Sequence, residues 1–178
     1  MIAIRRILTA VLALLPVIAI AQPPAPKSGF RAEFLQDLDD VQKKIIDLAA
    51  ATPADKYNWR PAAGVRSVSE VYMHIAGGNY FLASFMGMKA PVYDEQTLER
   101  IHDKDRVLAE LKKSFVHLRT AALNATDADL DKPIKMFGND TTERAGFMAA
   151  LVHLHEHLGQ SIAYARMNGI VPPWSASP

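Results

Sequence analysis

Apolar residues recur every three or four positions along four long segments of the chain, which is the spacing of one helix face. The pattern predicts helices over residues 30–51, 67–87, 103–124 and 142–167. Hardly any segment alternates apolar and polar residues as a half-buried strand does, although residues 132–141 are compatible with a short hairpin that turns at Gly138-Asn139-Asp140. We therefore expect an all-α protein, a four-helix bundle with long decorated loops.

Serines and glycines add detail to the first two helices. Ser28 is a suitable N-cap for the first helix, and either Ser67 or Ser69 for the second. Gly77-Gly78 interrupts the second helix, at a cost of about 1 kcal/mol per glycine relative to alanine. We expect the glycine pair to mark either a close contact between helices or space that another group needs.

Residues 1–21 have the layout of a cleavable signal peptide. A positively charged start precedes an apolar run over residues 8–20, and the run ends in Ala19-Ile20-Ala21. A membrane anchor is the alternative, but this run is short for a span of about 20 apolar residues and contains Pro16. We expect cleavage after Ala21 and a periplasmic or secreted protein. The mature chain then comprises a leader (22–29), a bundle domain (30–174) and a short tail (175–178).

Composition and charge exclude several classes of function. The chain has 178 residues, with 20 Lys and Arg against 19 Asp and Glu, so it lacks the basic excess of a nucleic-acid-binding protein. It has no cysteine, which excludes disulfides, cysteine-ligated zinc, iron–sulfur clusters and thiol nucleophiles. We expect neither a nucleic-acid partner nor a membrane association after signal cleavage.

A histidine cluster near the C-terminus carries the clearest chemical signal. His153 and His157 are four residues apart, so they lie on one helix face and can converge on one divalent metal. His155 lies roughly 200° around the helix from His153, and we expect it in the core or in a supporting role. Gln160 and Tyr164 share the side of the histidine pair and are candidates to support the ligands or face a substrate.

This pair alone does not establish a metal site, because two histidines at this spacing more often occur by chance, on a protein surface or in a core, than as metal ligands. The sequence is not a zincin motif either, since HExxH would need a histidine where Gly159 stands. His74, in an apolar stretch of the second helix, is either a core histidine or the third ligand of a catalytic-type site. We expect His102 and His117 on the solvated surface.

Four motifs, taken in order, resemble the DinB family, also called DinB/YfiT-like metalloenzymes, over residues 30–174. The motifs are Tyr57-Asn58-Trp59-Arg60-Pro61, Glu70 to Ala76, His153 to Gln160 and Asn168 to Trp174. The resemblance implies a four-helix bundle, often a homodimer, with a divalent metal held by three histidines, here His74, His153 and His157. We expect zinc, with nickel or iron as alternatives. Several relatives are cytoplasmic thiol-dependent enzymes, and the export signal departs from that background.

Three functions are compatible with this sequence. The first is a metal-dependent hydrolase or transferase that acts on a small-molecule substrate. The second is a non-catalytic periplasmic bundle that binds a metal or a ligand, and the third is a bundle with a vestigial site whose dimer surface matters. The hydrolase version lacks an evident carboxylate base, because Glu156 is expected to point away from the ligand face.

Protein recovered from the periplasm or the medium should begin at Gln22, or at the pyroglutamate formed from it, because the small residues at positions 19 and 21 direct cleavage after Ala21. N-terminal sequencing or intact mass measures this directly. A soluble cytosolic protein that retains Met1 would contradict the prediction.

Overall fold

The computed structural model describes residues 23–91 and 95–175, so the predicted signal peptide lies outside the described residues. The four predicted long helices are confirmed to within two residues at each end, as α1 (Phe30–Ala51), α2 (Val68–Phe85), α4 (Lys104–Asn124) and α5 (Glu143–Met167). Short 3-10 turns occur at Ala54–Lys56, Asp129–Asp131 and Pro173–Ser175. The fold is the expected all-α, four-helix bundle.

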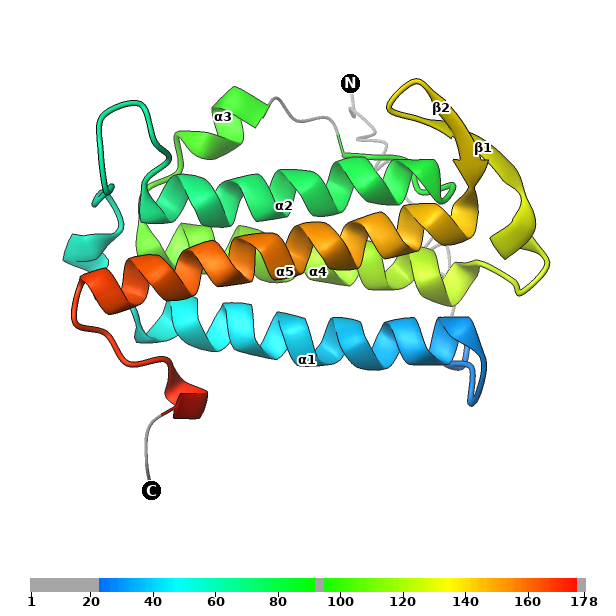
Figure 1. The fold of residues 1–178 in the computed structure, drawn as a ribbon, viewed down its shortest axis with the longest axis horizontal. Helices are drawn as coiled ribbons and strands as arrows, with labels where there is room; N and C mark the ends of the chain where they lie inside the picture. Colours follow the sequence, from blue (N-terminus) through cyan, green and yellow to red (C-terminus); the bar gives the residue numbers. More distant parts are fainter. Residues whose placement is uncertain (1–22, 92–94, 176–178) are drawn as a thin grey trace, which may run out of the picture.

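Each long helix packs against two others, and α2 packs against α4 and α5 (Figure 1). Helix α1 completes the bundle by packing against the same two helices. Helices α2 and α5 run in opposite directions side by side (Figure 1). The outward groove between them therefore combines the first half of α2 with the second half of α5.

Helices α2 and α4 are neighbours that run in the same direction (Figure 1). The chain that joins them must therefore return along the length of the bundle. For the 18-residue helix α2 this distance is about 27 Å. A short helix that the sequence pattern did not predict, α3 (Glu95–Glu99), forms on this return and packs against α2. Leu98 is buried and anchors α3 to the core. The long connection thus lies along the bundle and delivers residues to the outside of α2.

The apolar stripes of the four long helices form one core. Phe34 of α1 and Phe147 of α5 pack edge to face with ring centroids 4.8 Å apart. The largest fully buried side chains come from every long helix and from the loop after α1; they include Tyr57, Tyr72, Phe115, Leu38 and Ile45. Among the described residues, no helix is both long and apolar enough to cross a bilayer. The core gives the bundle a source of stability that does not involve the histidine cluster.

The second helix begins with a capping box, as the sequence allowed. The Ser67 side chain accepts a hydrogen bond from the Glu70 backbone N–H, and the Glu70 carboxylate accepts one from the Ser67 backbone N–H. The prediction for the first helix was wrong: Gly29, with φ 80°, is the N-cap, and Ser28 makes no cap. Backbone geometry at the glycine replaces the side-chain cap there.

A hairpin precedes α5, formed by β1 (Pro133–Met136) and β2 (Asn139–Thr142) in antiparallel register. Met136 pairs with Asn139, so the turn residues are Phe137 and Gly138 rather than the predicted Gly138-Asn139-Asp140. Both have positive φ, 51° and 83°, which a two-residue type I′ turn requires. A phenylalanine was not expected in that conformation, because β-region and helical φ values suit it better.

Candidate metal centre

Three histidines meet in the groove between α2 and α5. His74 comes from α2, and His153 and His157 lie one turn apart on α5. One ring nitrogen of each lies within 4.8 Å of the others, and the Nε2 atoms of His74 and His153 are 3.3 Å apart. The ring centroids are 4.5 to 5.2 Å apart. The two predicted candidates on α5 and the one on α2 are therefore brought together, and no other such group occurs among the described residues.

Gly78 is what allows α5 to place His153 so close to α2. A Cβ atom on Gly78 would lie 2.2 Å from Cε1 of His153 and 2.9 Å from both ring nitrogens. Carbon atoms do not approach each other that closely, so any side chain at position 78 would have to displace the ring. The glycine pair seen in the sequence thus marks a close contact, and the imidazole fills the space of the missing side chain.

Burial keeps two members of this donor set, His153 and His157, neutral. Desolvation, together with the neighbouring His157 and His74 and with Arg66, lowers the pKa of His153 to about 4. Burial also lowers the pKa of His157, although its hydrogen bond to Gln160 acts in the opposite direction. Neutral imidazoles have a lone pair available, which is the form that binds a metal. At neutral pH the site needs no deprotonation of these two rings.

A chain of hydrogen bonds fixes the orientation of His157. Its Nδ1–H donates to Oε1 of Gln160 at 2.9 Å, and the Gln160 amide donates to the Tyr164 hydroxyl at 3.1 Å. That hydroxyl in turn donates to the backbone carbonyl of Arg66, at 3.1 Å. Because Nδ1 holds the proton, Nε2 of His157 presents its lone pair to the cluster. Gln160 and Tyr164, the two candidates that the sequence indicated beside the histidine pair, thus lie on the Nδ1 side of His157, away from the cluster.

Glu99 is a candidate site residue that sequence reasoning missed. It is the last residue of α3, and its Oε1 lies 3.7 Å from Nδ1 of His74. Arg66 holds the same oxygen through its Nε at 2.8 Å. A carboxylate behind a ligating histidine is a common means of orienting the ring and raising its basicity. No local sequence motif signals this contact, because it depends on the path of a long connection.

A broad polar hollow opens beside His157. Its volume is about 800 Å³, and its walls are Arg60, Gly64, Val65, Arg66, Glu70, Glu99, Glu156, His157 and Gln160. Arg60 pairs with Glu70 at 2.9 Å, and Arg66 pairs with Glu99 at 2.8 Å. Glu156, which we expected to point away from the ligand face, is also one of the residues that line this hollow. Carboxylates therefore do border the histidine cluster.

The other histidines lie apart from the cluster. His155 is exposed, so it does not lie in the core, which was one of the two positions expected for it. Its Nδ1 bonds the Leu151 carbonyl of its own helix, and it is not part of the histidine cluster. His102 is exposed and bonds the Ser69 hydroxyl at 2.8 Å. His117 is half-buried against the Tyr80 ring, contrary to the surface position predicted for it, and burial lowers its pKa.

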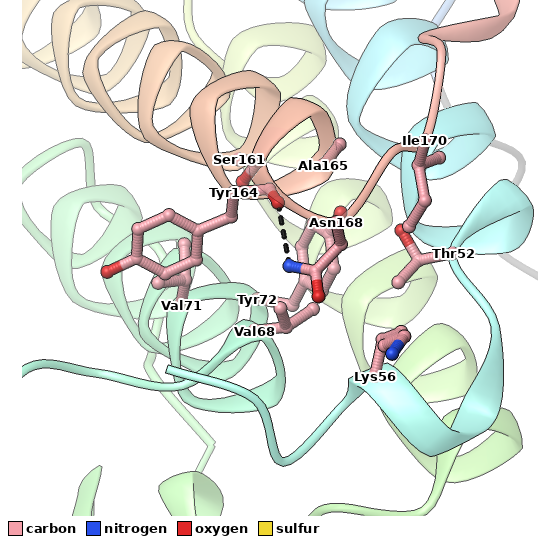
Figure 2. A pocket seen from close by; sticks show the side chains of 10 residues that line it. All are labelled: Thr52, Lys56, Val68, Val71, Tyr72, Ser161, Tyr164, Ala165, Asn168 and Ile170. Carbon is pink, nitrogen blue, oxygen red and sulfur yellow. Dashed lines mark hydrogen bonds between the residues drawn. The ribbon is translucent and has the colours of Figure 1, made fainter. Parts of the chain in front are cut away.

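An enclosed cavity between α2 and α5 near Asn168 is too small to be a substrate site. Its volume is about 10 Å³, which is room for about one water molecule. Figure 2 shows Asn168 bonded to the Tyr164 backbone carbonyl, while the Tyr164 ring extends away from it. The functional candidate is therefore the histidine cluster with its open hollow.

The donor set fits a divalent metal. Histidine nitrogens bind zinc at about 2.0–2.1 Å, so two ligands of a tetrahedral ion lie about 3.3 Å apart. That is the separation of the Nε2 atoms of His74 and His153. Three imidazoles next to an open hollow match a catalytic type of site, which keeps one position free. The same nitrogens suit nickel or iron, so the arrangement does not name the ion.

The comparisons with known proteins agree with this fold. A family model of the DinB superfamily matches residues 37–161. A DinB-like protein from Bacillus cereus has 18% identity and a TM-score of 0.70, over 79% of this chain and 93% of that one. A DinB-like protein from Bacillus subtilis has 18% identity and a TM-score of 0.62, over 78% of this chain and 94% of that one. A conserved protein from Enterococcus faecalis has 16% identity and a TM-score of 0.62, over 76% of this chain and 94% of that one. No curated protein matches the chain.

Alanine substitution of His153, His157 or His74 should each abolish stoichiometric zinc binding, because three nitrogens surround one point in the groove. His155→Ala should bind zinc as the wild type does, since its ring bonds its own helix away from the cluster. Titration calorimetry on untagged protein measures the difference. Equal loss in all four variants, or full retention in His74→Ala, would contradict the three-histidine site.

Gly78→Ala should weaken zinc binding about 10- to 100-fold, the usual loss when a ligating imidazole is misoriented. The added methyl group must push the His153 ring out of its place. Gly159→Ala is the matched control on α5, where a Cβ atom would meet nothing within 4 Å. It should leave zinc affinity unchanged and raise the free energy of unfolding by about 1 kcal/mol. Unchanged affinity in Gly78→Ala would show that His153 is not a ligand.

Proposed function

The chain belongs to the DinB superfamily, and from that premise we propose that it is an exported, metal-dependent enzyme of hydrolase or transferase type that acts on a small molecule. The observation that carries the proposal is the convergence of three imidazoles beside a polar hollow with carboxylates in its wall. A bound divalent ion supplies Lewis acidity to an oxygen of the substrate. Zinc is the ion that we propose, with nickel and iron as alternatives.

The residues around the cluster have separate tasks in this proposal. Gln160 retains the proton on Nδ1 of His157, so that the other nitrogen stays available. Glu99 faces Nδ1 of His74 and stabilises positive charge that develops on that ring, while Arg66 keeps the carboxylate in place. Glu156 lines the hollow next to His157 and is the carboxylate that can accept a proton from a nucleophile bound there.

Export and assembly are part of the same proposal. The mature protein acts in the periplasm or outside the cell, where low-molecular-weight thiols are scarce. We therefore favour hydrolysis or transfer to an oxygen acceptor over thiol transfer. A homodimer is proposed on the family resemblance.

A non-catalytic bundle that binds a metal, or a metal-bound ligand, at the same site is the second candidate. The ion pair of Glu99 with Arg66 favours it, since the carboxylate nearest to the histidines is already engaged and partly neutralised. Both candidates need the metal, and only the first needs turnover.

Metal analysis of the untagged mature protein, followed by assays with panels of small esters, amides and phosphoesters, separates the candidates. We expect zinc at one ion per chain and zinc-dependent turnover of at least one panel class that His153→Ala abolishes. Glu99→Gln should lower zinc affinity or turnover about 10- to 100-fold, as loss of a supporting carboxylate does. Glu156→Gln is the matched control for zinc affinity, which it should leave unchanged.

Two outcomes would count against the proposal in different ways. Stoichiometric zinc without turnover on any panel would favour the non-catalytic bundle. A protein that binds no divalent ion in the micromolar range would remove both candidates.

A further inference from the structure

A second hollow adjoins the histidine cluster, on the side opposite to the polar one. Its volume is about 350 Å³, and its walls are His74, Gly77, Gly78, Phe81, Leu82, Phe137 and His153. No aspartate, glutamate, lysine or arginine lines it. The polar hollow reaches the cluster at His157, and this apolar hollow reaches it at His74 and His153. The cluster thus lies between two spaces of opposite character along one groove.

The glycine pair of α2 forms part of the wall of the apolar hollow. Gly77 and Gly78 both line it, and the His153 ring, which fills the place of a Gly78 side chain, forms another part of the wall. The side chain of Phe81, one turn further along α2, extends the wall and is 46% exposed. Small-molecule sites commonly have volumes of about 300–1,000 Å³. The hollow is therefore large enough for one ring or one branched alkyl group and too small for a folded partner.

Phe137 covers the outer end of this hollow from the tip of the hairpin. It is 66% exposed and has φ 51°, a conformation that bulky residues rarely adopt. Asparagine or glycine would suit this turn better, because the left-handed conformation is unfavourable for a phenylalanine. Burial does not offset that cost, because most of the ring faces solvent. Unfavourable backbone conformations of this kind concentrate at ligand sites.

Three aromatic rings meet at this position. The centroid of Phe137 lies 5.9 Å from those of Phe81 and Phe85, and these two are 5.1 Å apart. The hairpin thus adds one ring to a pair on α2. We call these three rings the aromatic edge; two of them, Phe81 and Phe137, line the same hollow as the histidines. A ligand group placed between Phe137 and His153 would bury apolar surface of both.

We propose that this hollow binds an aryl or branched alkyl group of the substrate, and that Phe137 determines specificity for that group. The inference rests on the proposed function, because the reacting group of the same molecule then lies at the histidine cluster and its polar end in the hollow beside His157. The substrate class is a small amphipathic molecule with an uncharged apolar end. No aspartate, glutamate, lysine or arginine lines the hollow to pair with an ionic group at that end.

Two hydroxamates that differ only in their apolar end test this proposal on the zinc-loaded mature protein. Acetohydroxamate reports on the metal, and benzohydroxamate adds a phenyl ring. We expect benzohydroxamate to bind at least tenfold more tightly by titration calorimetry. Phe137→Asn should reduce that preference at least threefold, without changing zinc stoichiometry or acetohydroxamate affinity. Asparagine tolerates the turn, so this variant keeps the fold and its thermal midpoint does not fall.

Val171→Asn is the matched control, since Val171 is a similarly exposed apolar residue, 61% accessible, that does not line the hollow. It should keep the full preference for benzohydroxamate. Equal binding of the two hydroxamates by the wild type would overturn the inference and leave the metal site intact. Absence of zinc binding would instead defeat the proposed function. A changed oligomeric state of Phe137→Asn in sedimentation, with the preference unaltered, would reassign the aromatic edge to an interface between two copies.

Discussion

The candidate site depends on one steric condition, the lack of a side chain at Gly78 where α5 crosses α2. The imidazole of His153 occupies the space that a Cβ atom would take, at 2.2 Å. This contact sets the separation of the two helices at the level of the cluster and thereby the 3.3 Å between His153 and His74. A glycine in mid-helix is unfavourable by about 1 kcal/mol, and here it permits a close approach that no other residue allows.

A second constraint comes from chain connectivity. Helices α2 and α4 lie side by side in the same direction, so the chain between them returns along the bundle. This return carries α3, and at its end Glu99 faces His74 from outside the helical pair. A bundle of antiparallel neighbours with short loops would have no chain at that position. The carboxylate at the site is thus a consequence of topology, whereas the histidines are a consequence of helix geometry.

This difference explains what the sequence could predict. The four long helices follow from apolar periodicity, and the shared face of His153 and His157 follows from the spacing of a regular helix. Glu99 could not be found in this way, because its neighbour His74 is distant in sequence and no periodic signal links the two. The Phe137 turn was misplaced for another reason: turn propensity favours Gly-Asn-Asp, and the strand register overrode it.

The electrostatics of the groove are consistent with a site that is prepared before a ligand arrives. Burying three carboxylates at such short distances would be costly without a bound cation, since like charges repel strongly in a medium of low dielectric constant. Neutral imidazoles avoid this cost, and burial favours the neutral form of two of them by lowering the pKa of His153, to about 4, and that of His157. The charged groups, Arg66 with Glu99 and Arg60 with Glu70, stand as pairs in the wall of the hollow, where solvent reaches them. The fold can therefore hold the donor set in place by packing and by the hydrogen bonds that orient His157, and the apolar core between the helices supports this arrangement without an ion.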